Sequence, residues 1–192
     1  MDFEVVQKVI RQRRSYKPAQ MNGKKIEDAT IWQLLELADW APTHANTEPW
    51  RFVVFANEAV QKFCYDHAEL YKANMGDRFE KGKYEKILHN GDAASHIVAV
   101  YMKRAGNAKL PVVEEVCAVS AAVENLLLGA AALNIAALWS TGGLLFHPAM
   151  KTYFSLHEDD QMLGFLYLGY SDKAPKEGER LVPLQEKTDW RG

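Results

Sequence analysis

The stretch from residue 112 to residue 134 is apolar on nearly every side, and it constrains the fold more than any other part of the chain. A helix without a polar face has to be buried. Ser120, Glu124 and Asn125 interrupt the apolar run, which therefore lacks the roughly 18 uncharged apolar residues typical of a membrane span. We predict that this helix lies in the core of the fold and that the chain has no membrane partner.

Strands and further helices are expected to surround this core helix. Runs rich in β-branched and aromatic residues predict strands at residues 51–56, 96–104, 136–141 and 162–170. Helical periodicity and capping residues predict helices after Asp2, at 27–40, at 58–71 and from Pro148 onward. With few strands and a buried long helix, the pattern favours one mixed α+β domain over residues 1–192 and leaves an α/β arrangement open.

Two local features of the chain lead to more specific expectations. Segment 72–92 carries many charges of both signs and three glycines, which predicts an exposed, mobile excursion. Asn134 is the C-terminal residue of the predicted core helix, at a position where a left-handed backbone conformation is common.

Composition excludes several classes of function. The chain has 23 Lys and Arg against 25 Asp and Glu, a net charge of −2, so it lacks the basic footprint of a nucleic-acid binder. Cys64 and Cys117 lie far apart, outside any CxxC motif, and we expect them to pack as small apolar residues. The N-terminal residues do not resemble a secretory signal, so a cytoplasmic location is expected.

Common catalytic motifs do not occur in the chain. It contains no GxGxxG after a strand, no GxxxxGK[ST], no GxSxG and no HExxH. His44 and Glu48 are four residues apart in a Pro-bounded loop, where a polar loop histidine is a better interpretation than a metal ligand. Glu114 and Glu115 open the core helix, where acidic residues suit the helix dipole. We expect no metal site.

Two polar segments stand out as a possible anion and ring site. "RRSYKP" offers Arg13, Arg14 and Ser15, and arginine forks match phosphate geometry. "APTHANTEPW", residues 41–50, adds hydrogen-bonding groups and a tryptophan that could form a flat wall. The plainer alternative is that the arginines are solvated cations at a helix C-terminus.

Four motifs in order resemble the FMN-dependent nitroreductase family: "RRSYKP", "APTHANTEPWRFVVF", "SAAVENLLLGAAALNIAALWSTGG" and "ERLVPLQEKTDW". The resemblance implies an α+β homodimer with a central antiparallel sheet flanked by helices. It also implies that FMN lies at the dimer interface and that a C-terminal arm, about residues 171–192, extends over the partner subunit.

The resemblance also assigns cofactor contacts to particular residues. Arg13 and Ser15, with Arg14 beside them, would hold the phosphate or the ribityl chain, and Lys17 would lie near the pyrimidine side of the ring. Residues from the 42–46 loop would come from the partner subunit, and the stretch after the third strand would pass the reactive nitrogen. Arg180 would return to the phosphate, with Lys176 as the other candidate. The implied FMN contacts are Arg13, Arg14, Ser15, Lys17, Pro42, Thr43, His44, Asn46, Thr141, Gly142, Gly143 and Arg180.

The implied activity is an NAD(P)H-driven, ping-pong reduction of nitroaromatic, quinone or similar electron-poor acceptors, in which the flavin carries the chemistry. Two departures from the family pattern affect this expectation. Relatives have a serine-rich loop where this chain has Pro42 to Asn46, and glycine is common at the position of Asn134. The alternatives are another flavin reaction on the same scaffold, such as reductive dehalogenation or flavin cleavage, and a non-catalytic FMN-binding module.

Overall fold

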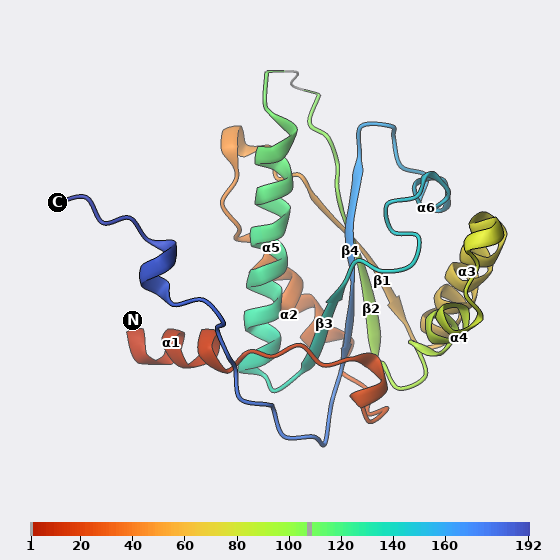
Figure 1. The fold of residues 1–192 in the computed structure, drawn as a ribbon, viewed down its shortest axis with the longest axis horizontal. Coiled ribbons are helices and arrows are strands. Elements are labelled where there is room, and N and C mark those ends of the chain that lie inside the picture. The colour runs from red at the N-terminus through yellow and green to blue at the C-terminus, as the bar shows by residue number, and fades with distance from the viewer. Residues whose placement is uncertain (1, 107–108) are drawn as a thin grey trace.

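An antiparallel sheet of four strands runs through the middle of the protein (Figure 1). The computed structural model describes residues 2–106 and 109–192. The strands are β1 (Trp50–Ala56), β2 (His96–Met102), β3 (Ala136–Ser140) and β4 (Gln161–Gly169), in the order β1-β2-β4-β3. Every neighbouring pair is antiparallel, which confirms the α+β class and excludes the doubly wound α/β alternative.

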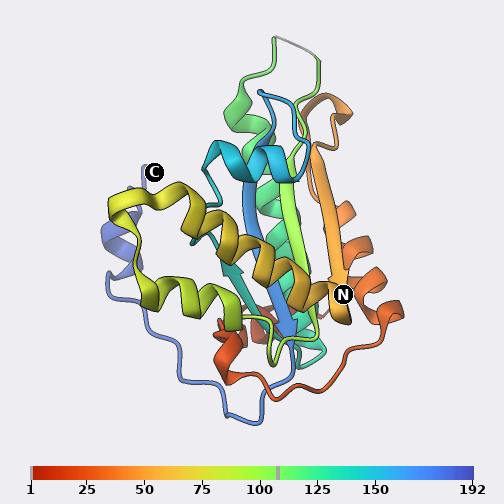
Figure 2. The same ribbon diagram turned by 90° about the vertical axis from the view of Figure 1, so that its right-hand side faces the viewer.

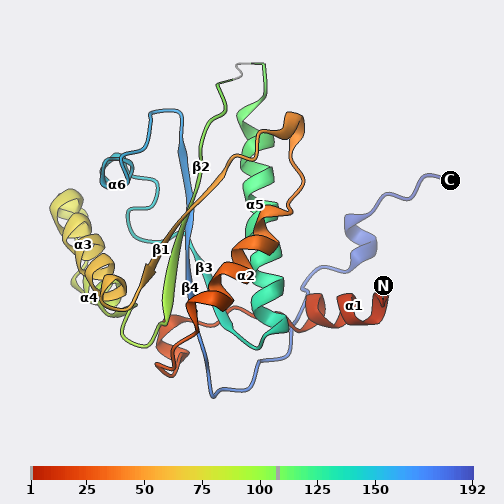
Figure 3. The same cartoon turned by 180° about the vertical axis from the view of Figure 1, so that it is seen from behind.

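Helices cover both faces of this sheet (Figures 2 and 3). One face carries α2 (Asp28–Asp39) and the core helix α5 (Val112–Ala132). The other face carries α3 (Glu58–Met75), α4 (Lys81–His89) and α6 (Pro148–Tyr153). The central strands β2 and β4 are therefore buried almost throughout, as expected for strands that have apolar neighbours on two sides.

Helix α5 is the core helix that the sequence predicts. Val119, Ala122, Val123 and Leu126 are fully buried between the sheet and α2. By length and hydropathy alone α5 could also cross a membrane, but 50% of that stretch is buried inside the protein. Its apolar surface thus serves the domain core. Asn134 has φ 56° after the end of α5, which confirms the predicted left-handed position.

Two expectations need correction. Segment 72–92 is largely exposed, as expected, but it is not an excursion from the fold, because α3 continues to Met75 and α4 follows after a short 3-10 turn. The two helices contact each other, and Ile87 of α4 is buried in the second core cluster. Cys64 is buried as expected, but Cys117 is exposed on α5, because it falls on the part of the helix that neither the sheet nor α2 covers.

Both ends of the chain lie on the outside of this framework. Asp2 caps α1 (Phe3–Gln12) by accepting a hydrogen bond from the Glu4 N–H at 3.0 Å, and α1 has no buried residue. After β4 the chain passes below the sheet and continues beyond α1 (Figure 1). Residues 172–192 are exposed throughout. The C-terminal arm therefore buries little of itself against its own subunit.

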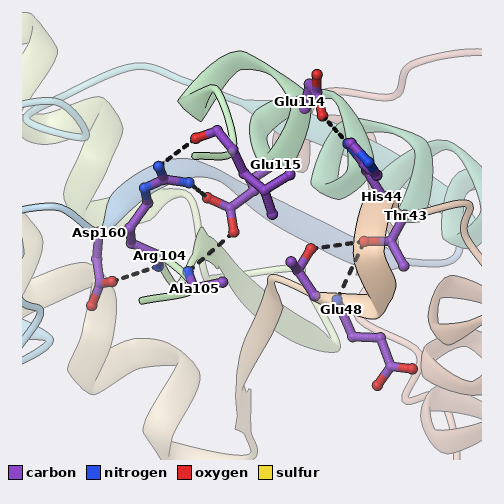
Figure 4. Close-up of polar contacts among 10 residues, drawn as sticks. Thr43, His44, Glu48, Arg104, Ala105, Glu114, Glu115 and Asp160 are labelled. Carbon is purple, nitrogen blue, oxygen red and sulfur yellow. Dashed lines mark hydrogen bonds and ion pairs between the residues drawn. The ribbon is translucent and has the colours of Figure 1, made fainter. Parts of the chain in front are cut away.

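The first turn of α5 carries two adjacent acids with different environments (Figure 4). Glu115 is buried and forms an ion pair with Arg104, which follows β2. Its other oxygen accepts from the Ala105 N–H at 3.0 Å, and Asp160 accepts from the Arg104 N–H at 2.9 Å. Glu114 is partly exposed and faces the 42–48 loop, where it contacts His44 at 2.5 Å. One acid thus anchors α5 to the sheet, and its neighbour anchors a loop.

We predict that Glu115→Gln lowers the free energy of unfolding by roughly 3 kcal/mol, because it removes the buried negative charge that faces Arg104. Glu114→Gln is the matched control and is expected to cost less than about 1 kcal/mol, since its pair is solvent-accessible. Urea denaturation of both variants measures the difference. Equal losses in the two variants would contradict the assignment of Glu115 as the anchor.

Candidate functional site

Arg13 lies where α1 ends and reaches toward the far half of α5. Its Nε contacts Glu124 Oε1 at 3.3 Å, and its side chain is 27% exposed. A guanidinium group has two further nitrogens in its fork. Arg13 is therefore oriented by Glu124 while it keeps donors that could bind an anion.

Arg14 has a different environment, because backbone carbonyl groups surround its guanidinium. Its Nε donates to Lys176 O at 2.8 Å, and its Nη1 donates to Arg11 O at 2.6 Å and to Arg13 O at 2.7 Å. These contacts tie the C-terminal arm to the end of α1. Arg14 thus has its guanidinium engaged by backbone carbonyl groups, whereas Arg13 keeps donors that could bind an anion.

Ser15 and Tyr16 lie beside the edge strand β3, and Lys17 follows them. Ser15 forms an isolated parallel bridge with Ala137, and the Tyr16 N–H donates to Ala137 O at 2.9 Å. Lys17 is exposed and precedes a short 3-10 turn, Pro18–Gln20. The segment that follows the arginines is thus fixed along β3, and Ser15 and Lys17 are both solvent-accessible.

A cavity of about 790 Å³ opens between α1, the end of α5, the start of β3 and the arm. Arg13 and Arg14 line it together with Asn134. Lys176 also lines it, whereas Arg180 is not among its lining residues and donates to the adjacent Glu179 O. We call this space the arginine cavity. Within one subunit, Lys176 is therefore better placed than Arg180 to share an anion with Arg13.

The 42–48 loop is unusual in its backbone. Ala45, Asn46 and Glu48 all have positive φ angles, of 53°, 52° and 42°. Such conformations are uncommon for non-glycine residues, and where the surroundings enforce them they are concentrated at functional sites. A short 3-10 turn, His44–Asn46, lies within this loop.

Side chains hold this strained loop in place (Figure 4). Thr43 Oγ1 contacts Thr47 Oγ1 at 2.9 Å and accepts from the Glu48 N–H at 3.3 Å. His44 pairs with Glu114 of α5 and not with Glu48, which stands four residues later in the loop. A hollow of about 390 Å³ lies beside the loop, with Thr43, Asn46 and Trp50 among its lining residues.

The arginine cavity and the 42–48 loop do not meet within one subunit. His44 is bound at the first turn of α5 through Glu114, and Arg13 is bound just past the middle of the helix through Glu124. Ten residues of helix separate these two acids, which corresponds to about 15 Å. The candidate site residues of the 42–48 loop and those of the arginine cavity therefore form two separate surfaces of the subunit.

The loop that follows β3 lies on a buried histidine of α3. Leu144 N–H donates to His67 Nε2 at 3.3 Å. Gly143 has φ 71°, and a Cβ atom there would lie 2.2 Å from the same nitrogen. Thr141 and Gly142 are exposed on the outer side of the loop. Glycine is required at 143 both by its backbone angle and by this close approach.

Sequence reasoning missed His67 and the role of Glu114. A single histidine within an amphipathic helix carries no signal for the loop that it contacts 77 residues later. The Gly142-Gly143 pair does indicate a close approach of the backbone, although not to which partner. The helix dipole alone accounts for an acid at position 114, whereas its contact with His44 depends on the fold.

We predict that Gly143→Ala lowers the free energy of unfolding by roughly 1–3 kcal/mol, because a positive φ becomes strained and the new methyl group overlaps His67. Gly142→Ala is the control, since the nearest atom to a Cβ there is Ser140 Oγ at 3.8 Å. Its effect should stay within about 0.5 kcal/mol. Thermal denaturation distinguishes them, and a Gly143→Ala protein as stable as Gly142→Ala would refute the close contact.

Comparison with known proteins places this arrangement among relatives. YfhC of Bacillus subtilis (strain 168), whose name places it with the NAD(P)H nitroreductases, is 26% identical over 185 residues, 95% of this chain and 92% of that protein. A nitroreductase-like family protein from Bacillus cereus has a crystal structure that matches with a TM-score of 0.82 at 25% identity, over 100% of this chain and 97% of that one. A Desulfovibrio desulfuricans nitroreductase-type structure, solved in complex with FMN, matches with a TM-score of 0.72 at 24% identity, over 100% and 99% of the two chains.

A family model, described as "Nitroreductase family", matches residues 10–170. This range begins just before the arginine pair, includes the whole sheet and ends after β4. The chain therefore belongs to the nitroreductase family.

Proposed function

We propose that the protein is an FMN-dependent oxidoreductase that uses NAD(P)H to reduce nitroaromatic, quinone or similar electron-poor acceptors. The observation that carries this proposal is that Arg13 and the glycine loop after β3 lie near opposite ends of the same edge strand, β3. Ser15, two residues after Arg13, is bridged to Ala137 near the start of β3, and Thr141 follows the end of that strand. Four residues of extended strand span about 13 Å, a separation suited to a ligand with a phosphate at one end and a ring at the other.

The residues present fit such a cofactor at both ends of the strand. Arg13 offers guanidinium donors in the arginine cavity, and the exposed Ser15 follows two residues later, outside the lining of that cavity. Gly142 is exposed and has no side chain, which allows the backbone to approach a flat ring closely. Lys17 supplies a cation to the same region, where a fixed positive charge favours an anionic ring. Arg14 supports the site by holding the arm.

A homodimer would complete the site. The 42–48 loop lies too far along α5 to reach the arginine cavity of its own subunit, so we propose that Pro42, Thr43, His44 and Asn46 contact the cofactor of the partner. Large apolar side chains remain exposed on α1, α2 and the arm, as expected of surfaces that meet another subunit. They include Phe3, Ile10, Trp32, Trp40, Leu181, Leu184 and Trp190. An arm that extends over the partner would cover part of this surface.

FMN, when bound, supplies two-electron redox chemistry between NAD(P)H and the acceptor, in the ping-pong order expected above. The protein's own residues bind and orient the cofactor and shape the space above it. His44, held by Glu114, gives the partner-side wall a titratable polar group. The cytoplasmic location and the single-domain boundary at residues 1–192 stay predictions.

Reconstitution with FMN tests the proposal. The purified protein should be yellow or become yellow on incubation with FMN, and NADH or NADPH should bleach it under nitrogen. A nitroaromatic or quinone acceptor should then restore the colour. A protein that takes up no FMN would overturn the proposed function, and one that binds FMN but is not reduced would leave only the non-catalytic alternative.

Arg13→Ala tests the anion site directly. The loss of a partly buried phosphate partner should weaken FMN binding by about 2–5 kcal/mol. Arg11→Ala is the matched control: Arg11 is an exposed cation in the last turn of the same helix, and its removal should leave FMN affinity unchanged. Fluorescence titration of FMN into apoprotein measures both. Equal effects would return Arg13 to the role of a helix-terminus cation.

A further inference from the structure

His67 is a buried titratable group for which the proposed function provides no role. It lies on α3 with 3% of its surface exposed, between the rings of Phe63 and Phe165, whose centroids are 5.8 Å and 5.3 Å away. Burial lowers the pKa of His67 to about 4, since the apolar surroundings disfavour the charged form. The imidazole is therefore neutral at physiological pH.

The hydrogen bond from the loop determines which nitrogen carries the proton. Leu144 N–H donates to Nε2, so Nε2 is an acceptor and the proton of the neutral ring lies on Nδ1. Nδ1 has no hydrogen-bond partner in the described part of the chain. A buried donor without a partner is destabilising, and the neighbouring aromatic rings offer at most a weak contact. Core packing alone does not account for a histidine here, because phenylalanine would fill a similar space without the orphaned donor.

The contacts of His67 are with the loop after β3. Gly143 packs against the ring so closely that a Cβ atom added there would lie 2.2 Å from Nε2. Leu144 and Leu145 are buried beneath the loop, while Thr141 and Gly142 remain exposed above it. The imidazole thus lies directly beneath the exposed part of the loop. Its size limits how close Gly143 can come, and its acceptor nitrogen binds the Leu144 N–H.

We infer that His67 is a positioning residue for the cofactor: a neutral imidazole beneath loop 141–144 that fixes the height and orientation of the loop's N–H groups toward the flavin. This inference rests on the proposed function, because it needs the loop to face FMN. His67 lies on α3, on the opposite side of the loop from the ligand. Its hydrogen bond to the loop would change the midpoint potential of the flavin without any direct contact between them.

Three variants separate positioning from stability. His67→Phe keeps the ring shape but removes the acceptor for Leu144 N–H. His67→Gln retains an acceptor at a similar reach. Val60→Ala, two turns earlier on α3 and buried in the same core cluster, removes packing without touching the loop. For each, the measurements are the FMN midpoint potential, the melting temperature of the apoprotein and hydrogen exchange across residues 141–146.

We expect the melting temperature of apo His67→Phe to stay within about 4 °C of wild type, because the variant loses the orphaned donor together with the acceptor. Its loop amides should exchange faster. Its FMN potential should become more negative, since displaced N–H groups stabilise the negative charge of the reduced ring less, and flavin reduction by NAD(P)H should slow roughly tenfold. His67→Gln should recover most of the potential. Val60→Ala should lower the melting temperature and leave the potential unchanged.

The outcomes separate the two claims. FMN bound to His67→Phe at the wild-type potential, with unchanged loop exchange, overturns this inference and leaves the proposed function intact. A potential that shifts equally in Val60→Ala also overturns it, since general loss of packing would then explain the effect. Wild-type protein that takes up no FMN overturns the proposed function and this inference with it.

Discussion

The burial of α5 between the sheet and α2 is the constraint on which the rest of the structure depends. Because α5 has almost no polar face, the sheet must present an apolar surface along the whole length of the helix. The polar groups of α5 lie near its ends and on the side that neither the sheet nor α2 covers. Glu114 and Glu115 occupy one end, and Glu124 lies toward the other. The helix thereby holds the 42–48 loop and Arg13 apart at a fixed separation.

Much of the fold could be predicted because its signals are local and repeated. The apolar run of α5, the β-branched strands and the cap at Asp2 each follow from side chains within a few residues. Asn134 could be placed in the left-handed region because helix ends have few solutions. The prediction of an excursion at 72–92 was wrong because it rested on the charges and glycines of the segment. The contacts of α3 with α4 and the burial of Ile87 depend on the fold.

The candidate site was predictable only in part, for a related reason. The arginine pair and the polar loop can be recognised as short motifs, but their contacts join residues far apart in the chain. Arg13 meets Glu124, His44 meets Glu114, and Leu144 meets His67. None of these pairs has a spacing that periodicity could reveal. The strain at Ala45 and Glu48 is also invisible in the sequence, since neither residue type signals a positive φ.

The carbonyl contacts of Arg14 have a consequence for how the arm and the anion site influence each other. The guanidinium of Arg14 binds the carbonyl groups of both Lys176 and Arg13, so a single side chain holds the start of the arm and the backbone of the residue proposed to bind an anion. Whatever free energy arm docking contributes to ordering this segment is available to anion binding, and by thermodynamic reciprocity an anion bound at Arg13 favours the docked arm by the same factor.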